Sequence, residues 1–142
     1  MNYRHAFHAG NHADVLKHVA LLACLAHLSK KPAPFAALDA FAGPGLYDLE
    51  GDAATRSPEF RGGVGQIWNW ERPPPALAPY RNALRAANPD GRLRFYPGSP
   101  KLIRNALRES DRLIACELHP EDAALLKANF RGDAQTQIHA RD

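Results

Sequence analysis

The sequence predicts an α/β fold built on a parallel sheet, and three observations carry that prediction. Residues 35–40 are apolar except for Asp39, a pattern typical of a short strand buried on both faces. The Gly-Pro-Gly at 43–45 permits a sharp turn, because glycine has no Cβ. A second apolar stretch, 113–117, also ends on an acid, Glu117. Acid-tipped apolar strands beside a Gly-x-Gly turn are features of the adenosine-binding end of a Rossmann-like sheet.

Length and composition limit the class of protein. At 142 residues, with 45% hydrophobic and 23% charged residues, the chain has room for at most one ordinary globular domain. It has no apolar run of about 18 residues and no signal-peptide core, so no membrane span is expected. Cys24 and Cys116 are interpreted as small buried hydrophobes in a reducing cytoplasm. The net charge of +3 suits a phosphate-bearing partner and a plain basic surface equally.

The glycine loop favours one class of nucleotide cofactor over another. The dinucleotide fingerprint G-x-G-x-x-G has its third glycine where this chain has Asp48, whose carboxylate would repel a pyrophosphate. S-adenosyl-L-methionine has no phosphate, and an acid such as Asp39 suits its ribose hydroxyls and amino group. Gly43 and Gly45 would line that pocket, although Gly-x-Gly also occurs in ordinary tight turns. A dinucleotide-dependent oxidoreductase therefore stays as the outside alternative.

Basic and aromatic side chains are concentrated at the N-terminus. Tyr3, Arg4 and His5 suit stacking and hydrogen bonding to a splayed RNA base and its phosphates, with a mobile basic tail as the alternative. His5, His8 and His12 have no cysteine beside them and few nearby carboxylates, so no metal site is predicted.

A helix is expected from about residue 13 to residue 28, with Asn11 as its cap. Lys17 and His18 lie near the N-terminal end of this helix, where positive charge opposes the helix dipole. Stability of the helix would not explain these two residues, whereas a ligand-facing role would.

The segment 52–92 is interpreted as an insertion into the sheet domain. The acid that ends the second strand of a Rossmann-like sheet follows the glycine loop by about 20 residues, but here it is Glu117. The sequence therefore predicts 1–51 and 93–142 as parts of one domain and 52–92 as a helical subdomain. Arg81, Arg85, Arg92 and Arg94 form either a basic face for nucleic acid or a solvated helix face.

The sheet pattern resumes after the insertion. A short strand at 93–96 leads through a turn into a helix at 101–107, where Ser99 either caps the helix or faces the cofactor. Glu117 is expected to accept hydrogen bonds from both ribose hydroxyls of the cofactor.

A helix at 120–130 and a strand at 136–140 are expected next. Asp142 then falls where an acid can accept the exocyclic amine of an adenine ring. The strand expected on the other side of the glycine-loop strand, with any catalytic residues that it carries, is not in this sequence.

Three strings in this chain resemble one known family. They are YRHAFHAGNHADVLKH at 3–18, FYPGSP at 95–100 and ELHP at 117–120. They are similar to those of the RlmJ-type bacterial 23S ribosomal RNA adenine-N6 methyltransferases, and the chain resembles the first half of a typical member. The resemblance implies a Rossmann-like class I methyltransferase fold with an inserted helical subdomain, incomplete here after its first three core strands.

The resemblance also implies roles for individual residues. Phe41 stands where the family commonly has a histidine, so its contact with the cofactor would be packing or backbone. The family's catalytic Asp-Pro-Pro-Tyr, whose aspartate would bind the N6 amine, has no counterpart here. The resemblance implies a cofactor set of His18, Phe41, Ser99, Glu117 and Asp142 and an RNA set of Tyr3, His5 and Lys17. The residue pattern itself adds Asp39, Gly43 and Gly45 to the cofactor loop and Arg4 to the RNA set.

The implied activity is methylation of N6 of adenine 2030 in 23S ribosomal RNA, free of protein or in an early assembly intermediate. The full-length enzyme would be a cytoplasmic monomer without a membrane partner. This chain alone is expected to be inactive, because the catalytic motif is missing. The alternative from another class is a catalytically incompetent fragment that only binds RNA or cofactor.

Overall fold

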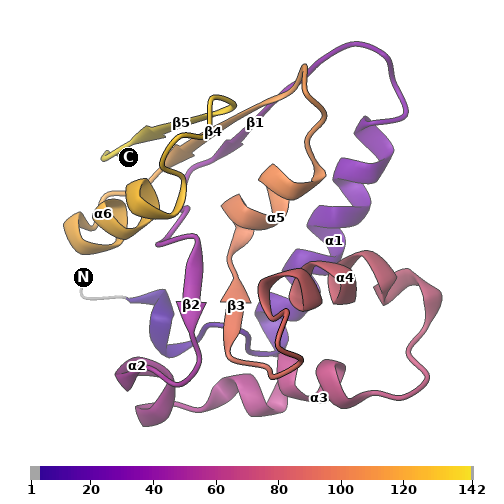
Figure 1. Cartoon of the computed structure of the whole chain (residues 1–142), viewed down its shortest axis with the longest axis vertical. Helices are drawn as coiled ribbons and strands as arrows, with labels where there is room; N and C mark the ends of the chain where they lie inside the picture. The colour runs from indigo at the N-terminus through magenta and orange to yellow at the C-terminus, as the bar shows by residue number, and fades with distance from the viewer. Residues whose placement is uncertain (1–3, 142) are drawn as a thin grey trace. The chain divides into compact units, whose positions relative to one another are not determined.

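The computed structural model describes residues 4–141 and has a mixed α/β architecture with a parallel sheet, as predicted (Figure 1). In chain order the elements are η1 (His5–Phe7), α1 (His12–Leu28), β1 (Ala36–Asp39), β2 (Leu46–Asp48), α2 (Asp52–Arg56), η2 (Glu59–Gly62), α3 (Val64–Asn69), η3 (Pro75–Leu77), α4 (Ala78–Ala87), β3 (Phe95–Pro97), α5 (Ser99–Ala106), β4 (Arg112–Cys116), α6 (Pro120–Asn129) and β5 (Thr136–His139).

The chain divides into two compact units, each assembled from two separate segments. The helical unit comprises Met1–Ala20 and Tyr47–Tyr96, and the sheet unit comprises Leu21–Leu46 and Pro97–Asp142. The division of the chain at residues 51 and 92 that the sequence predicts stays a prediction.

The sheet unit is built on three parallel strands in the order β1-β4-β5. β1 and β4 are in register from Ala36 opposite Arg112 to Asp39 opposite Ala115. Both strands therefore end at the same edge of the sheet. Fully buried Leu113, on β4, and Leu126, on α6, belong to the core of this unit, and each such burial stabilises the fold by about 1.5–3 kcal/mol.

The prediction that the first strand is buried on both faces is wrong. The exposed fraction of Leu38 is 66%. In the described sheet β1 has β4 as its one neighbour, and alternate residues of β1 are exposed. The apolar run of residues 35–40 identified the strand correctly, but burial also depends on what covers each face.

A buried carboxylate that sequence analysis missed ties the beginning of β1 to the segment before β4. Asp111 accepts hydrogen bonds from the backbone N–H of Phe35, at 3.0 Å, and from the guanidinium of Arg108, at 2.8 and 2.9 Å. The same guanidinium donates to the carbonyl oxygens of Lys31 and Ala33. The hydrogen bonds from Arg108 and from the Phe35 amide hold the pKa of the Asp111 carboxyl well below its usual range, so this carboxylate stays charged.

The helical unit contains α2, η2, α3, η3 and α4, with a core that includes Tyr80 and Leu84 from α4. The side chain of Asn88 donates to the carbonyl oxygens of Leu84 and Phe95 and accepts from the N–H groups of Arg94 and Phe95. These four bonds fasten the end of α4 to the beginning of β3. β3 pairs with β2, a three-residue strand that the sequence did not predict.

Two further sequence expectations have clear outcomes. The backbone N–H of Asp14 donates to Oδ1 of Asn11 at 3.0 Å, which confirms Asn11 as the cap of α1. Cys24 is exposed on α1, so the prediction that both cysteines are buried is wrong for Cys24 and right for Cys116. Within residues 4–141, no helix has the length and apolar character required to cross a membrane.

Candidate functional site

The glycine loop lies at the edge where β1 and β4 end. The backbone N–H of Ala42 donates to the carbonyl oxygen of Cys116 at 3.0 Å, and that of Gly98 donates to the carbonyl oxygen of Gly45 at 2.9 Å. The loop is therefore fastened at one end to β4 and at the other to the turn before α5. Asp39 and Glu117, the acids expected at the ends of two apolar strands, are both at this edge.

The sharp turn expected of the two glycines is present. Gly43 and Gly45 have φ angles of 61° and 80°, in the left-handed region that side chains disfavour. At Gly45 an added Cβ would also come within 3.1 Å of the Phe130 ring and 3.2 Å of Leu126. The loop thus needs glycine at this position both for its backbone angle and for its packing.

Glu117 organises the loop through both of its carboxylate oxygens. Oε2 accepts the backbone N–H of Gly43 at 2.8 Å, and Oε1 accepts the backbone N–H of His119 at 2.7 Å. A carboxylate offers about four lone-pair directions, so each oxygen keeps one for a ligand. The half-buried, backbone-held carboxylate can therefore accept two hydroxyl groups, which is the requirement for binding a ribose diol.

Asp39 presents an oxygen that the protein does not satisfy. Its Oδ1 accepts the backbone N–H of Phe41 at 3.3 Å, whereas its buried Oδ2 has no hydrogen-bond partner among residues 4–141. A buried acceptor without a donor is costly, and a ligand hydroxyl or ammonium group would remove that cost. A hydroxyl-bearing and amine-bearing cofactor such as S-adenosylmethionine fits this pair of acids.

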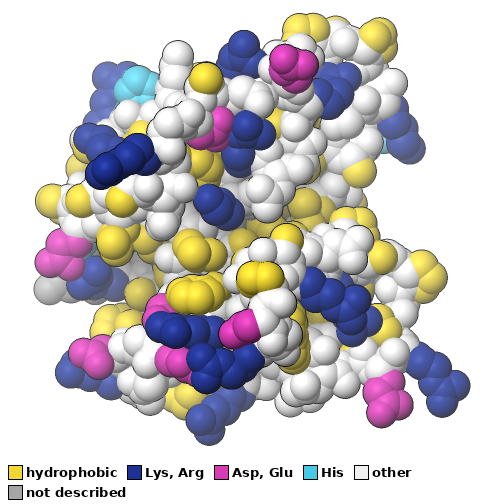
Figure 2. All heavy atoms as spheres, viewed as in Figure 1, with side chains coloured by type: hydrophobic (Ala, Val, Ile, Leu, Met, Phe, Trp, Pro, Cys, Tyr) yellow, Lys and Arg dark blue, Asp and Glu magenta, His cyan; other side chains and the backbone are white. Residues whose placement is uncertain are grey.

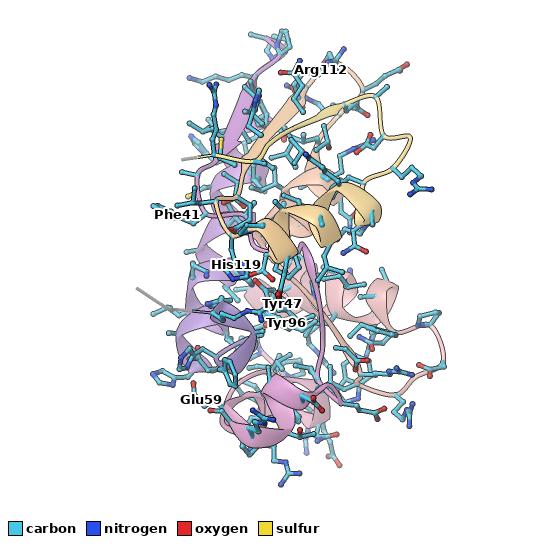
Figure 3. All side chains as sticks on the ribbon, turned by 90° about the vertical axis from the view of Figure 1, so that its left-hand side faces the viewer. Phe41, Tyr47, Glu59, Tyr96, Arg112 and His119 are labelled. Atoms are coloured by element: carbon cyan, nitrogen blue, oxygen red, sulfur yellow. The ribbon has the colours of Figure 1, made fainter. Side chains whose placement is uncertain are left out.

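Two exposed apolar side chains accompany these acids. Phe41, in the glycine loop, is 90% exposed, and Leu118, next to Glu117, is 64% exposed. Figure 3 labels Phe41 and His119, which follow the ends of β1 and β4. Exposed aromatic and aliphatic groups beside polar acceptors are typical of ligand sites.

Ser99 is the first residue of α5, and it does not act as the helix cap. The N-cap residue is Gly98, and no side chain makes a capping hydrogen bond there. The Ser99 hydroxyl has no hydrogen bond to any other residue of 4–141 and is half-buried. It is therefore available to a ligand. Asp142, the last acid of the predicted cofactor set, lies outside the described residues.

In the helical unit, two of the predicted RNA-binding residues meet at one carboxylate. Asp14 is buried, and its oxygens lie 2.7 Å from Nε2 of His5 and 2.7 Å from Nζ of Lys17. Burial raises the pKa of Asp14, but hydrogen bonds from His5, Lys17 and the Gly10 amide outweigh it and lower that pKa well below its usual range.

His5, Asp14 and Lys17 also line a hollow of about 410 Å³. The other residues that line it are His8, Asn11 and Ala13. Arg4 has an extended backbone immediately before η1, and Tyr3 lies outside the described residues. Lys17 forms an ion pair with Asp14 within the first turns of α1, a contact that the sequence did not predict.

His18 is buried and neutral, so it is not the dipole-opposing charge that the sequence suggested. Its exposed fraction is 1%, and its Nδ1 lies 2.7 Å from the hydroxyl of Tyr96. Burial lowers the pKa of His18 to about 4, with Lys17 and His5 adding to the shift and Asp14 opposing it. Sequence analysis missed Tyr96 as its partner, although Tyr96 lies in the FYPGSP string, because 78 residues separate the two.

The four arginines of 81–94 divide into two pairs. Arg92 lies 3.3 Å from Glu50 and Arg94 lies 2.9 Å from Asp48, so acids compensate both charges. Arg81 and Arg85, on α4, form no ion pair with any residue that the structure describes. On the face shown in Figure 2, Lys and Arg side chains are interspersed with Asp and Glu side chains.

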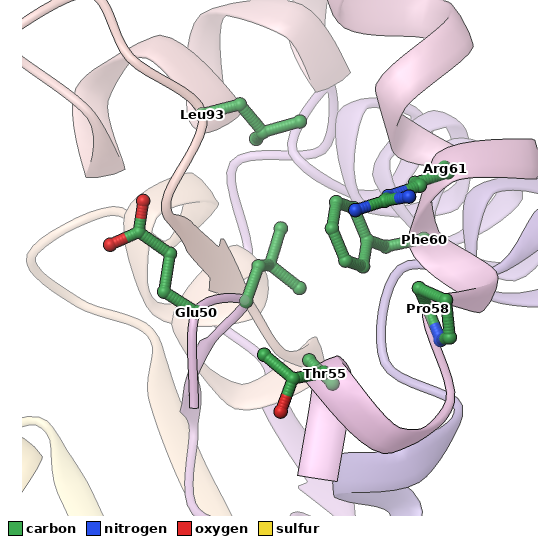
Figure 4. A pocket seen from close by; sticks show the side chains of 8 residues that line it. Glu50, Thr55, Pro58, Phe60, Arg61 and Leu93 are labelled. Atoms are coloured by element: carbon green, nitrogen blue, oxygen red, sulfur yellow. The ribbon is translucent and has the colours of Figure 1, made fainter. Parts of the chain in front are cut away.

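A separate hollow of about 330 Å³ lies in the helical unit (Figure 4). Glu50, Thr55, Pro58, Phe60, Arg61 and Leu93 are among its lining residues. None of its lining residues belongs to the predicted cofactor or RNA sets. This hollow therefore adds nothing to the candidate site.

Comparisons with known proteins agree with one another. The model of the family described as "Ribosomal RNA large subunit methyltransferase D, RlmJ" matches residues 32–142. The chain is 43% identical over 142 residues to the ribosomal RNA large subunit methyltransferase J of Escherichia coli K12, and 38% identical over 139 residues to that of Haemophilus influenzae Rd. These alignments cover 100% and 97% of this chain but 51% and 50% of the two relatives.

A solved structure is also similar. The crystal structure of protein LPL1258 from Legionella pneumophila matches with a TM-score of 0.86 and 34% sequence identity, over 94% of this chain and 49% of that one. The chain thus spans about half the length of the curated relatives it matches.

Proposed function

The chain belongs to the RlmJ family of ribosomal RNA large subunit methyltransferases, and on this premise we propose that it supplies the cofactor-binding part of an adenine-N6 methyltransferase. The methyl donor is S-adenosylmethionine, and the substrate is 23S ribosomal RNA, free of protein or early in ribosome assembly. The proposed enzyme is a monomer that acts in the cytoplasm.

One observation carries the proposal: Glu117 and Asp39 lie at one sheet edge beside a glycine turn. Glu117 is held by two backbone amides with acceptor capacity left over, and Asp39 has a buried oxygen without a donor. These features support binding of a ribose and an amino group.

The remaining site residues are proposed from their family positions. His18, Ser99 and Asp142 would hold the cofactor with Glu117, and Phe41 would pack against it. Tyr3, Arg4, His5 and Lys17 would lie by the target adenine. The availability of the Ser99 hydroxyl and the meeting of His5 and Lys17 at Asp14 support these assignments.

The proposed fold is the Rossmann-like methyltransferase core, represented here by β1, β4 and β5, with 52–92 as its inserted helical subdomain. The similarity to the Legionella protein over 94% of this chain supports a shared fold.

The chemistry requires a positioned amine. When bound, S-adenosylmethionine would supply an electrophilic methyl group, whose transfer to adenine N6 would leave S-adenosylhomocysteine and release one amine proton. An adenine amine is a weak nucleophile, because its lone pair is delocalised into the ring. The residues of this chain would orient the ribose and the flipped base so that the two groups meet in line. The family's Asp-Pro-Pro-Tyr, which would accept from the amine, is not among the 142 residues.

A chimera tests the proposal. The matched half of the E. coli relative would be replaced by this chain and expressed in E. coli cells that lack the native protein. Mass spectrometry of 23S RNA should show N6-methyladenine restored, and restoration should be lost with Glu117→Gln but kept with exposed Glu109→Gln.

A chimera that binds S-adenosylhomocysteine but leaves the RNA unmethylated would favour the alternative of a binding module. A folded chimera that binds no S-adenosylhomocysteine would contradict the cofactor assignment. Nicotinamide fluorescence on adding NADH would instead favour the oxidoreductase.

A further inference from the structure

Three buried rings of the helical unit form a hydrogen-bonded chain. The hydroxyl of Tyr80 donates to the hydroxyl oxygen of Tyr96 at 3.3 Å, and that hydroxyl lies 2.7 Å from Nδ1 of His18. Tyr80, Tyr96 and His18 are 1%, 0% and 1% exposed. The His18 and Tyr96 rings are also stacked, with centroids 5.6 Å apart. Figure 3 labels Tyr96 and Tyr47, whose ring centroids lie 6.4 Å apart.

The number of available protons decides which group donates in each of these two hydrogen bonds. If Tyr80 donates to Tyr96, then Tyr96 has its own proton for Nδ1 of His18. Every polar side-chain atom of these three residues except Nε2 then has a hydrogen-bond partner. If His18 donated from Nδ1, Tyr96 would donate to Tyr80, and the Tyr80 proton would have no acceptor among residues 4–141. A buried unsatisfied hydroxyl is costly, and an imidazole nitrogen accepts better than a phenol oxygen. The first direction is therefore favoured.

In that direction Nε2 of His18 carries the proton. Nε2 is buried and has no hydrogen-bond partner among the residues that the structure describes. Neutral histidine also suits the proposed cofactor, because a positive imidazolium would repel a sulfonium. The charged groups that act on His18 are Asp14, Lys17 and His5.

We propose that Tyr80 and Tyr96 are positioning residues that hold His18 as an Nε2–H donor for an acceptor atom of the bound cofactor. This inference rests on the proposed function, and it adds two residues without a direct contact to the cofactor. The tyrosines set the tautomer of His18 before binding, so that the donor does not have to be rearranged when the cofactor arrives.

Nitrogen NMR of the ¹⁵N-labelled 142-residue chain at pH 7 tests the tautomer directly. The His18 signals are assigned by their loss in His18→Gln. The wild type should show a protonated Nε2 and an unprotonated Nδ1. Tyr96→Phe should convert His18 to a mixture of tautomers, and Tyr80→Phe should shift it partly. Tyr47→Phe, which removes a neighbouring buried hydroxyl, should leave His18 unchanged.

Calorimetry with S-adenosylhomocysteine tests the consequence. Tyr96→Phe should weaken binding by about tenfold, the usual effect of one lost hydrogen bond in a buried site. His18→Gln, whose amide nitrogen superposes on Nε2, should bind more tightly than His18→Asn, whose amide superposes on Nδ1.

A wild-type His18 protonated on Nδ1 would overturn the inference, as would a Tyr96→Phe variant that changes neither the tautomer nor the affinity. If Tyr96→Phe does not fold, Tyr80→Phe gives the same two measurements with a smaller change in packing. If the tautomers are as expected but no variant binds S-adenosylhomocysteine, the proposed cofactor is refuted. The role of Tyr80 and Tyr96 in setting the tautomer of His18 is then still supported.

Discussion

At the scale of single residues, Glu117 is the side chain on which most of the proposal depends. Its two oxygens each accept one backbone amide. Glu117→Gln would place an amide donor against one of those N–H groups and remove an acceptor for the ribose. We predict that the affinity for S-adenosylhomocysteine falls by about 10- to 100-fold, the range for a hydrogen bond to a charged group. Calorimetry measures the change.

The matched control is Glu109→Gln. Glu109 is exposed and its side chain makes no hydrogen bond or ion pair with any residue of 4–141. Its affinity should stay within about twofold of the wild type. Equal losses in the two variants would contradict the assignment of Glu117.

The buried His18 makes the fold sensitive to mild acid. Its pKa is lowered from 6.5 to about 4 by burial, so the unfolded chain takes up a proton before the folded chain does. Stability is therefore present above pH 6.5 and is lost as the pH falls toward 4. The loss attributable to His18 should reach about 2–3 kcal/mol. Urea unfolding of the wild type and His18→Gln at pH 7 and at acid pH measures it, and equal acid losses in both would contradict this account.

Individual residues also differ in whether their roles could be predicted from the sequence. The acids Asp39 and Glu117 were predictable, because each follows an apolar run. The partners of His18 and Lys17 were not predictable, because the helix-dipole argument considers only the charge of a side chain near the helix end and not its contacts with other residues. Lys17 is compensated by Asp14, and His18 is neutral because it is buried beside Tyr96. Only the folded chain brings residues 18 and 96 together.

At the scale of elements, the glycine loop gives a sharp test. Gly45 and Gly132 have nearly equal φ angles of 80° and 81°, but only Gly45 lies against other side chains. Gly132→Ala should cost about 1 kcal/mol for its backbone angle alone. Gly45→Ala should cost about 2–4 kcal/mol, because its Cβ would also press on Phe130 and Leu126. Denaturant unfolding of both variants decides the matter, and identical costs would show that the loop is not tightly packed.

The helix α4 offers a second test. Arg81 and Arg85 are uncompensated, whereas Arg92 and Arg94 are paired with acids. We predict that the Arg81→Gln/Arg85→Gln variant weakens binding of a 23S RNA fragment and lowers the salt dependence of log K by about 1–2. The Arg92→Gln/Arg94→Gln variant should change both much less. A salt titration of binding distinguishes a nucleic-acid face from a solvated helix face, and equal effects of the two double variants would contradict the prediction.

Elements differ in how well the sequence predicted them. The helices expected at 13–28 and 120–130, and the strands expected at 113–117 and 136–140, lie within one or two residues of their observed bounds. β2 was missed, because three residues that pair with a strand far along the chain carry no periodic signal. The exposed faces of β1 could not be predicted from an apolar run.

At the scale of the whole molecule, long-range contacts decide which segments fold together. The first 20 residues join Tyr47–Tyr96 in one unit. Within this unit the backbone N–H of Val64 donates to the carbonyl oxygen of Gly10, and the side-chain amide of Asn11 donates to the carboxylate of Glu59. These bonds join residues about 50 positions apart. Local patterns cannot encode such pairings, whereas apolar runs that end on Asp39 and Glu117 do identify the two strands that pair as β1 and β4.

Backbone amide NMR with S-adenosylhomocysteine added to the ¹⁵N-labelled chain tests the central claim most directly. If the acids and the glycine turn form the ribose site, the largest shift changes will fall on the amides of Gly43, Glu117 and His119. Those changes should be absent in Glu117→Gln and present in Glu109→Gln. A folded chain in which these amides do not move, or in which changes are confined to the hollow lined by Thr55 and Arg61, would contradict it.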